Sequence, residues 1–449
     1  MSSFDNQPVL SANTRTYVGE TAFANDKFSR KQLAEKLTDY LSRLNDGAVL
    51  AIDAPWGEGK TWFGKNWEKQ LKDDDYKTIY IDAFEQDYID DTFMLLASEF
   101  TELLNDEEDN KTKVQLVEKA SQVAKVTLSM GTKIGINLAT RLFLGQVNMT
   151  EEIEKAVEEA GNKSADITSN WIKDKFNDYS QDKQTIQAFK KELSEYAVKQ
   201  EKPVIIFVDE LDRCKPDFAV SLIERIKHFF DVPNIVFVLL LNREQLEKAV
   251  KGVYGSETDA STYLGKFVNF FFSLPHARQN NHNSERKLSQ FIEQTMQKYK
   301  FQRENQHDGF INYIKFWVPR FNMSLRDIEK AVALYAFAYP TGELTYLLTY
   351  LIVLKIKKPT LYSQLQQGKI QAHKDAKKYI EYLMNEDTRK ESGESERVLP
   401  FYLEWHEAHI NGFKEIGEHL QNHYPTHWHV DKKDLFSFLS KKIDLEIER

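Results

Sequence analysis

One short stretch, residues 49–61, constrains the fold of this chain more than any other feature of its sequence. Its first five residues (VLAID) are apolar at four positions, and a turn with two glycines (APWGEG) separates them from an apolar pattern at helical spacing that comprises Trp62, Phe63 and Trp67. This order predicts a buried strand, a loop and a helix. A loop with little side-chain bulk exposes backbone N–H groups, and the amino end of the following helix adds positive potential. The stretch therefore predicts a binding site for a polyphosphate.

The loop matches the phosphate-binding pattern GxxxxGK[ST] with one departure, because Ala54 stands at the first glycine position. Alanine disfavours positive φ, so we expect the backbone there to keep a negative φ; the alternative is weakened nucleotide binding. In this pattern Lys60 reaches the outer phosphates and the Thr61 hydroxyl binds magnesium. The competing explanation is a GKT sequence in an ordinary surface turn. The predicted nucleotide-binding residues are Pro55, Trp56, Gly57, Glu58, Gly59, Lys60 and Thr61.

A second apolar run ends in acidic residues, within the sequence KPVIIFVDELDR at 202–213. Five apolar residues in a row predict a buried parallel strand, which would deliver Asp209 to a magnesium ion beside the phosphate loop. Glu210, one residue further, is the predicted general base that activates a water molecule. The alternative is that the acids only cap a following helix. That explanation fits Asp212 but not the first two acids, because an exposed cap rarely follows five buried residues.

WGEGKT and FVDELDRCKP together resemble the KAP family of P-loop NTPases. Further similar segments lie at 236–250, 263–275 and 324–332, so the resemblance spans residues 15–365. It implies a catalytic glutamate, a parallel five-stranded sheet with strand order 5-1-4-3-2, and ATP and Mg²⁺ as cofactors. Adenine rather than guanine is implied by the resemblance, and the chain has no guanine-reading NKxD sequence.

The strand expected at 235–242 ends in Asn242. Related ATPases place a polar residue there that senses the γ-phosphate and orients the attacking water. KAP members usually carry Asp at this place, although Asn can also hydrogen-bond a water molecule. Arg243 follows, with either a catalytic role or an ordinary place at the start of a surface helix.

P-loop enzymes commonly need a cation opposite the γ-phosphate, from their own helical lid or from a neighbouring subunit. Arg326 lies in SLRDIEK, which resembles the arginine-bearing helical element of the family, and it is the predicted residue. A plain salt bridge is the alternative for this side chain. Arg213 and Arg320 are the other candidates, and Arg213 fits an internal structural pair equally well.

Periodicity along the chain predicts an α/β class with a helical insertion and a C-terminal all-helical region, and the resemblance implies that the α/β part is a P-loop NTPase core. Two further core strands are expected at 77–84 and 267–275, and the apolar segment 343–356 is too short to span a bilayer and predicts a buried helix. The predicted divisions are a disordered N-terminus (1–14), the NTPase core (15–104 and 201–276), the helical insertion (105–200), a helical lid or bundle (277–384), a mobile linker (385–397) and a C-terminal helical region (398–449).

The most apolar part of the insertion, residues 125–147, is interrupted by Lys133 and Arg141. It has no uninterrupted apolar run of about 18 to 20 residues, so we do not expect it to span a membrane. Its small and apolar residues predict a helical hairpin that packs on itself or on a second copy of the chain; contact with a membrane interface is the alternative. More apolar surface than one hairpin buries favours a homo-oligomer.

Composition limits the remaining classes. The net charge of −9 argues against bulk attraction to nucleic acid, and nothing else in the sequence indicates such a partner. The single cysteine cannot form an internal disulfide, and the amino-terminal residues do not resemble a signal peptide, so we expect a cytoplasmic protein.

Six of the eleven histidines lie between His406 and His429. His419 and His423 have the i, i+4 spacing that can hold zinc, but no cysteine accompanies them. In HEAH at 406–409 the histidines are three residues apart, unlike those of the metalloprotease pattern HExxH. We therefore expect no functional metal in this region.

Two kinds of function fit these features. The first is an ATPase whose hydrolysis drives conformational change or assembly, which the intact Asp209 and Glu210 favour; the resemblance implies a bacterial role in phage exclusion or stress signalling. The second is a nucleotide-gated scaffold or switch with little turnover, which could associate with a membrane. The chain contains no nuclease, protease or kinase motif, so any effector action would be mechanical or supplied by a protein partner.

Overall fold

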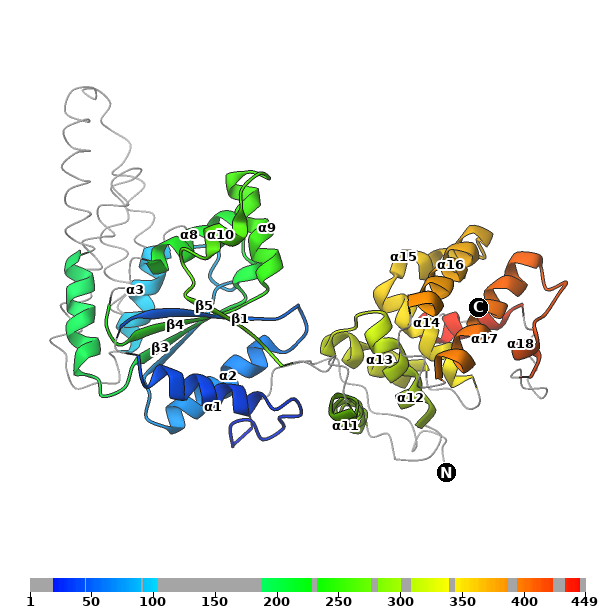
Figure 1. Cartoon of the computed structure of the whole chain (residues 1–449), viewed down its shortest axis with the longest axis horizontal. Helices are drawn as coiled ribbons and strands as arrows, with labels where there is room; N and C mark the ends of the chain where they lie inside the picture. The colour runs from blue at the N-terminus through cyan, green and yellow to red at the C-terminus, as the bar shows by residue number, and fades with distance from the viewer. Residues whose placement is uncertain are drawn as a thin grey trace, which may run out of the picture. The chain divides into compact units, whose positions relative to one another are not determined.

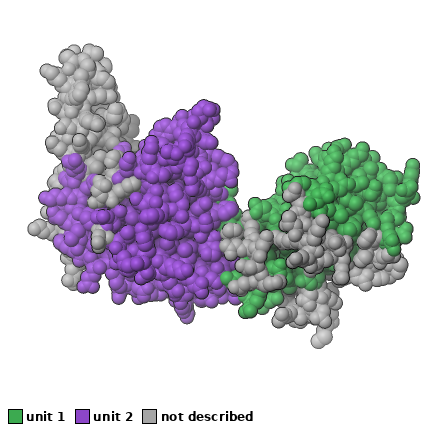
Figure 2. Space-filling view, in the orientation of Figure 1, with its two compact units in different colours: residues 1–15, 56–59, 276–449 green, residues 16–55, 60–275 purple. Residues whose placement is uncertain are grey.

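The computed structural model of the chain falls into two compact units (Figure 2). One comprises Thr16–Pro55 and Lys60–Pro275, and the other comprises His276–Arg449 with the short segments Met1–Arg15 and Trp56–Gly59. The structure describes residues 19–44, 46–89, 92–103, 187–227, 232–275, 282–299, 308–338, 344–386, 394–422 and 433–444.

Five parallel strands form the sheet of the first unit. The strands are β1 (Ala48–Asp53), β2 (Thr78–Asp82), β3 (Val204–Asp209), β4 (Ile235–Leu241) and β5 (Phe270–Ser273). Their spatial order is β2-β3-β4-β1-β5. Read from the other edge this is 5-1-4-3-2, so the predicted fold class and strand order are confirmed.

The central strands are apolar throughout because both of their faces are covered. Every residue of β3 and β4 is buried, whereas the edge strand β5 has no buried residue. A parallel strand covered on both faces needs an uninterrupted apolar run rather than alternation. The apolar runs of β3 and β4 predict buried strands for this reason.

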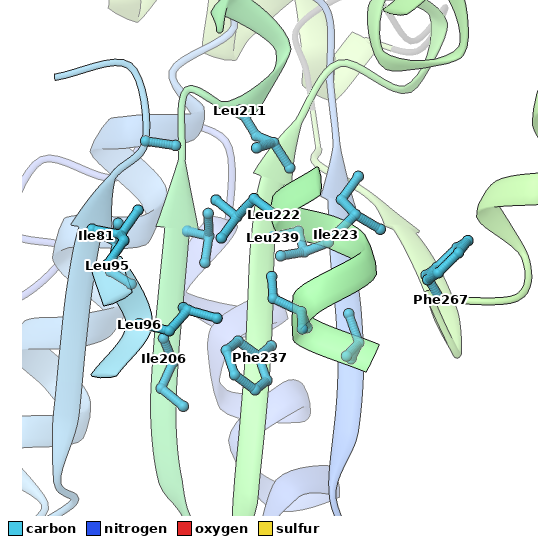
Figure 3. Packing of buried hydrophobic residues seen from close by; sticks show 14 of the residues in the cluster. Ile81, Leu95, Leu96, Ile206, Leu211, Leu222, Ile223, Phe237, Leu239 and Phe267 are labelled. Atoms are coloured by element: carbon cyan, nitrogen blue, oxygen red, sulfur yellow. The ribbon is translucent and has the colours of Figure 1, made fainter. Parts of the chain in front are cut away.

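Helices cover the two faces of the sheet, with α1 and α2 on one face and α3, α8, α9 and α10 on the other (Figure 1). Their bounds are α1 (Arg30–Leu41), α2 (Lys60–Asp73), α3 (Thr92–Leu103), α8 (Pro216–Lys227), α9 (Arg243–Tyr254) and α10 (Ala260–Leu264). Residues 187–199 form a further helix. Figure 3 shows Leu222 and Ile223 of α8 facing Phe237 and Leu239 of the sheet, all within one buried cluster.

The second unit is helical in its described parts. Its helices are α11 (His282–Lys298), α12 (Asp308–Arg320), α13 (Leu325–Ala338), α14 (Thr345–Lys357), α15 (Pro359–Gln366), α16 (Ile370–Glu386), α17 (Glu394–Asn411), α18 (Glu418–Asn422) and α19 (Leu435–Asp444). An unbroken buried run, residues 347–354, makes α14 the centre of this unit. A helix that is apolar all round must be enclosed by others, so the buried helix expected at 343–356 is confirmed.

Several expectations concern residues beyond those described. Outside the described residues lie the apolar segment 125–147, the N-terminus predicted to be disordered (1–14), most of the insertion and His423. The helices reach into both ends of the linker expected at 385–397, because α16 continues to Glu386 and α17 begins at Glu394. Among the helices that the structure describes, none is both long and apolar enough to cross a bilayer.

Candidate nucleotide-binding site

The candidate site lies at the carboxyl ends of the parallel strands, where open α/β sheets place their ligands. β1 leads into the phosphate loop, and Ala54 N–H donates to the carbonyl of Leu241 at the end of β4, at 3.2 Å. Positive φ occurs at Gly57 (82°) and Gly59 (79°) but not at Ala54. The alanine at the first loop position is therefore compatible with the turn, as expected, because the two positions that need left-handed backbone are both glycines.

The loop side chains differ in exposure. Pro55 and Trp56 are exposed, with Trp56 at 45%, whereas Glu58 is buried. These side chains do not carry the chemistry of a phosphate loop, which binds through backbone N–H groups. Lys60 and Thr61 form the first turn of α2, directly behind the loop.

Lys60 is nearly enclosed, at 9% exposure. Its Nζ donates to the carbonyl of Ala54 at 2.9 Å and lies 4.0 Å from a carboxylate oxygen of Asp212. Burial lowers the pKa of Lys60, and the charges of Asp212, Asp209 and Glu210 oppose that shift. The ammonium group is thus held at the inner end of the loop, close to three carboxylates.

Thr61 and Asp209, the two predicted magnesium ligands, lie together. Burial raises the pKa of Asp209, and the Thr61 side chain is among the groups that oppose that shift; Oδ1 of Asp209 accepts from the Glu210 backbone N–H at 2.8 Å. A hydroxyl and a buried carboxylate beside a phosphate loop are hard oxygen donors, and Mg²⁺ in such sites takes only one or two protein carboxylates, with phosphates and water completing its shell. The donor set therefore fits Mg²⁺.

Tyr80 is a residue of the site that sequence reasoning missed. It lies on β2, and its hydroxyl donates to Oδ2 of Asp209 at 2.7 Å. The two residues are 129 positions apart in the chain. Only the signal that β2 is a core strand was available in the sequence, and it does not say which side chain meets Asp209.

Glu210, the predicted general base, is engaged on both carboxylate oxygens. Oε1 accepts from the Thr61 hydroxyl at 3.2 Å, and Oε2 forms an ion pair with Arg213. Its backbone has a positive φ of 60°, which is uncommon for a residue with a side chain. Burial raises its pKa, helped by the charge of Asp209 and opposed by Arg213. Arg213 thus forms an internal ion pair with Glu210, which was one of the two roles considered for it.

Asn242 lies at the end of β4, as expected, and caps helix α9. Its Oδ1 accepts from the backbone N–H of Gln245 at 3.4 Å. Next to it, the backbone N–H of Arg243 donates to the Asp53 carboxylate at 2.9 Å, which ties the ends of β4 and β1 together. The Arg243 side chain contacts Glu247 at 2.9 Å and Ser261 at 2.6 Å. These contacts favour the structural alternative for Arg243.

The two candidate arginines of the helical unit lie in different elements. Arg326 is the second residue of α13. Arg320 ends α12, where its Nη1 donates to the carbonyl of Phe316 at 2.7 Å and its guanidinium lies 3.6 Å from the centre of the Phe316 ring. Arg320 is therefore occupied within its own helix, while the role of Arg326 stays a prediction.

The histidines of HEAH lie in helix α17, within the described residues. Among the described residues there is no group of three or more His, Cys, Asp or Glu side chains suited to a metal ion. His406 and His409 of HEAH instead pack with His373 from α16. Burial lowers the pKa of His373, His406 and His409, so the three side chains form a neutral cluster.

One family of known proteins matches more than half of this chain. The family profile described as the KAP family P-loop domain matches residues 30–340. No curated protein matches the chain. Among solved structures, the ORC2 protein of Aeropyrum pernix with ADPNP and ADP is similar at 12% identity and a TM-score of 0.36, over 97% of this chain and 99% of that one. A DNA replication initiation factor is similar at 11% identity and a TM-score of 0.35, over 96% and 99% of the two chains.

Proposed function

Because the chain belongs to the KAP family of P-loop NTPases, we propose that it binds ATP with Mg²⁺ at the phosphate loop and hydrolyses it. The observation that carries this proposal is the meeting of Lys60, Thr61, Asp209 and Glu210 at one end of the sheet. These residues come from two segments almost 150 positions apart, and together they supply a phosphate-binding cation, oxygen ligands and a base.

Each residue has a definite task in this proposal. Lys60 binds the outer phosphates, and Thr61 with Asp209 holds the metal, which when bound neutralises charge on the phosphate oxygens. Glu210 accepts a proton from the attacking water at a carboxylate oxygen. Its raised pKa suits that step, because a carboxylate with a higher pKa is a stronger base. Asn242 orients the water, and Arg326 supplies the remaining positive charge.

Glu210 must change partners before it can act as the base. Its Oε1 accepts from Thr61 and its Oε2 is paired with Arg213. Once the Thr61 hydroxyl turns to another acceptor, Oε1 can accept from water while Arg213 keeps the side chain oriented. Asn242 likewise has to share the Oδ1 that caps α9.

A steady-state ATPase assay with matched binding measurements tests the proposal. Glu210→Gln should retain ATP binding by calorimetry and slow hydrolysis by about a hundredfold or more. Lys60→Ala should lose binding, because it removes the cation of the phosphate loop. ATP binding to Lys60→Ala as tight as to wild type would show that the site has been misassigned.

The second candidate function is a nucleotide-gated switch with little turnover. The double engagement of Glu210 by Thr61 and Arg213 favours it, because a base held by an ion pair is not free to take a proton. This alternative predicts tight ATP binding with slow turnover that Glu210→Gln does not reduce further. The same assay therefore separates the two functions.

The cellular role and assembly state belong to the proposal as well. A role in phage exclusion or stress signalling rests on family membership, and a phage-challenge assay comparing wild type with Lys60→Ala tests it. Self-association rests on the apolar segment 125–147, outside the described residues. Light scattering with and without ATP, on wild type and on a Leu138→Glu, Leu142→Glu variant, should show an assembly that only wild type forms; a wild type that stays monomeric with ATP contradicts it.

A further inference from the structure

One partly buried phenol, that of Tyr80, reaches the carboxylate that is expected to hold the metal. Tyr80 lies opposite Phe207 in the register of β2 and β3, and its ring stacks on the Phe207 ring at 5.7 Å with an interplanar angle of 22°. Phe207 and Asp209 share one face of β3 because side chains alternate along a strand. The stacked ring therefore points along the strand, and its hydroxyl meets Oδ2 of Asp209 at 2.7 Å.

We propose that Tyr80 is a positioning residue that sets the orientation of the Asp209 carboxylate and so tunes the affinity of the site for magnesium. This inference rests on the proposed function, since it concerns the same metal site. Tyr80 itself is not a metal ligand in this proposal. It acts only through the carboxylate to which it donates.

The hydrogen-bond pattern of Asp209 supports this role. The Glu210 backbone N–H is 2.8 Å from Oδ1, and the Tyr80 hydroxyl is 2.7 Å from Oδ2. The carboxylate is thus fixed at both oxygens. The backbone of the next residue holds one oxygen, and a side chain of the neighbouring strand holds the other. Hydrogen-bond partners outside the first ligand shell orient metal ligands in this way, and their loss typically costs about 10- to 100-fold in metal affinity.

Helix α2 leaves room for the phenol at one position. A Cβ atom on Gly64 would lie 3.1 Å from the Tyr80 hydroxyl and 2.2 Å from a methyl carbon of Leu240. The glycine lets the helix that carries Thr61 approach the sheet closely. Thr61, Asp209 and Tyr80 are consequently held in one small volume by three elements of the fold.

The test is the magnesium dependence of nucleotide binding in the full-length chain, measured by calorimetry with a non-hydrolysable ATP analogue. Tyr80→Phe keeps the ring and removes only the hydroxyl. The expected result is a rise of about tenfold in the magnesium concentration that gives half-maximal tight binding.

Tyr76→Phe is the matched control. Tyr76 is a tyrosine of the apolar cluster against which Tyr80 packs. It precedes β2 and so lies at the opposite end of that strand from the register pair of Asp82 and Asp209. It should leave the magnesium dependence unchanged.

The outcomes separate this inference from the proposed function. A wild type that binds no nucleotide at any magnesium concentration contradicts both. A wild type that binds, with an unchanged magnesium dependence in Tyr80→Phe, contradicts the positioning role alone. A variant that weakens binding equally with magnesium and with EDTA assigns Tyr80 a purely structural role and also overturns the inference.

Discussion

Acidification should destabilise the helical unit through its buried histidines. His406 is fully buried and His373 is 2% exposed. The two are joined by a 3.0 Å contact between their Nδ1 atoms, and His406 Nε2 lies 3.0 Å from the Tyr350 hydroxyl. The His409 ring stacks on His373 at 4.2 Å. Burial lowers the pKa of all three, to about 3 for His373 and about 4 for His409.

The direction of the effect follows from where the protons bind. A histidine whose folded pKa lies below its unfolded value of about 6.5 takes up a proton more readily in the unfolded chain, so a fall in pH favours unfolding. As the pH falls, the loss of folding stability begins near the unfolded pKa and continues until the folded pKa is reached. From pH 6.5 to pH 5 it amounts to roughly 2 kcal/mol for His373, at 1.36 kcal/mol per pH unit. His409 is partly exposed and should add roughly 1 kcal/mol after allowance for solvent screening.

Hydrogen exchange of peptides from α16 and α17, corrected for intrinsic rates, measures the opening free energy of the helices that carry these residues. It is preferable to global denaturation, because a chain with two units need not unfold in one step. The opening free energy of wild type should fall by at least about 3 kcal/mol between pH 6.5 and pH 5, because His373 and His409 together account for about 3 kcal/mol and His406 acts in the same direction. His409→Gln should reduce that fall by about 1 kcal/mol, since it removes one titrating group.

Glu407→Gln is the matched control. Glu407 lies on the exposed side of α17, the helix of His406 and His409, and pairs with Lys377 of α16. It should leave the pH dependence unchanged. Equal opening free energies at the two pH values would refute the reasoning. So would a fall in stability that His409→Gln leaves intact.

Three further predictions concern packing and helix ends. Gly64→Ala should destabilise the core unit by about 1–2 kcal/mol despite the better helix propensity of alanine, because its Cβ would lie 2.2 Å from Leu240; a urea midpoint equal to that of wild type would contradict the close approach. Asn242→Ala should cost about 1 kcal/mol by removing the cap of α9, and Asn242→Ser should restore most of it in the same denaturation assay. Ser324→Ala should cost about 1 kcal/mol in the helical unit, because Ser324 and Asp327 exchange hydrogen bonds with each other's backbone N–H at the start of α13; unchanged hydrogen exchange in α13 would show that this capping contact is not used.

Local sequence determined the core strands and the phosphate loop. β3 and β4 are unbroken apolar runs because both faces of a central parallel strand are covered, so burial alone makes them recognisable. The loop is recognisable because Gly57 and Gly59 take left-handed backbone that other residues avoid, and Lys60 follows at a fixed spacing. Family resemblance supplied the strand order, which spacing along the chain cannot fix.

Only the tertiary structure decided the partners of the charged and polar side chains. The contact between Tyr80 and Asp209 joins residues 129 positions apart, and that between His373 and His406 joins residues 33 apart. No periodicity encodes either distance, because strand register and helix packing set them. Glu210 and Asn242 were each assigned one catalytic contact from sequence, yet Glu210 also pairs with Arg213 and Asn242 caps α9. A side chain's type limits which bonds it can form, but the neighbours that the fold brings within 3 Å or so decide which bonds it does form.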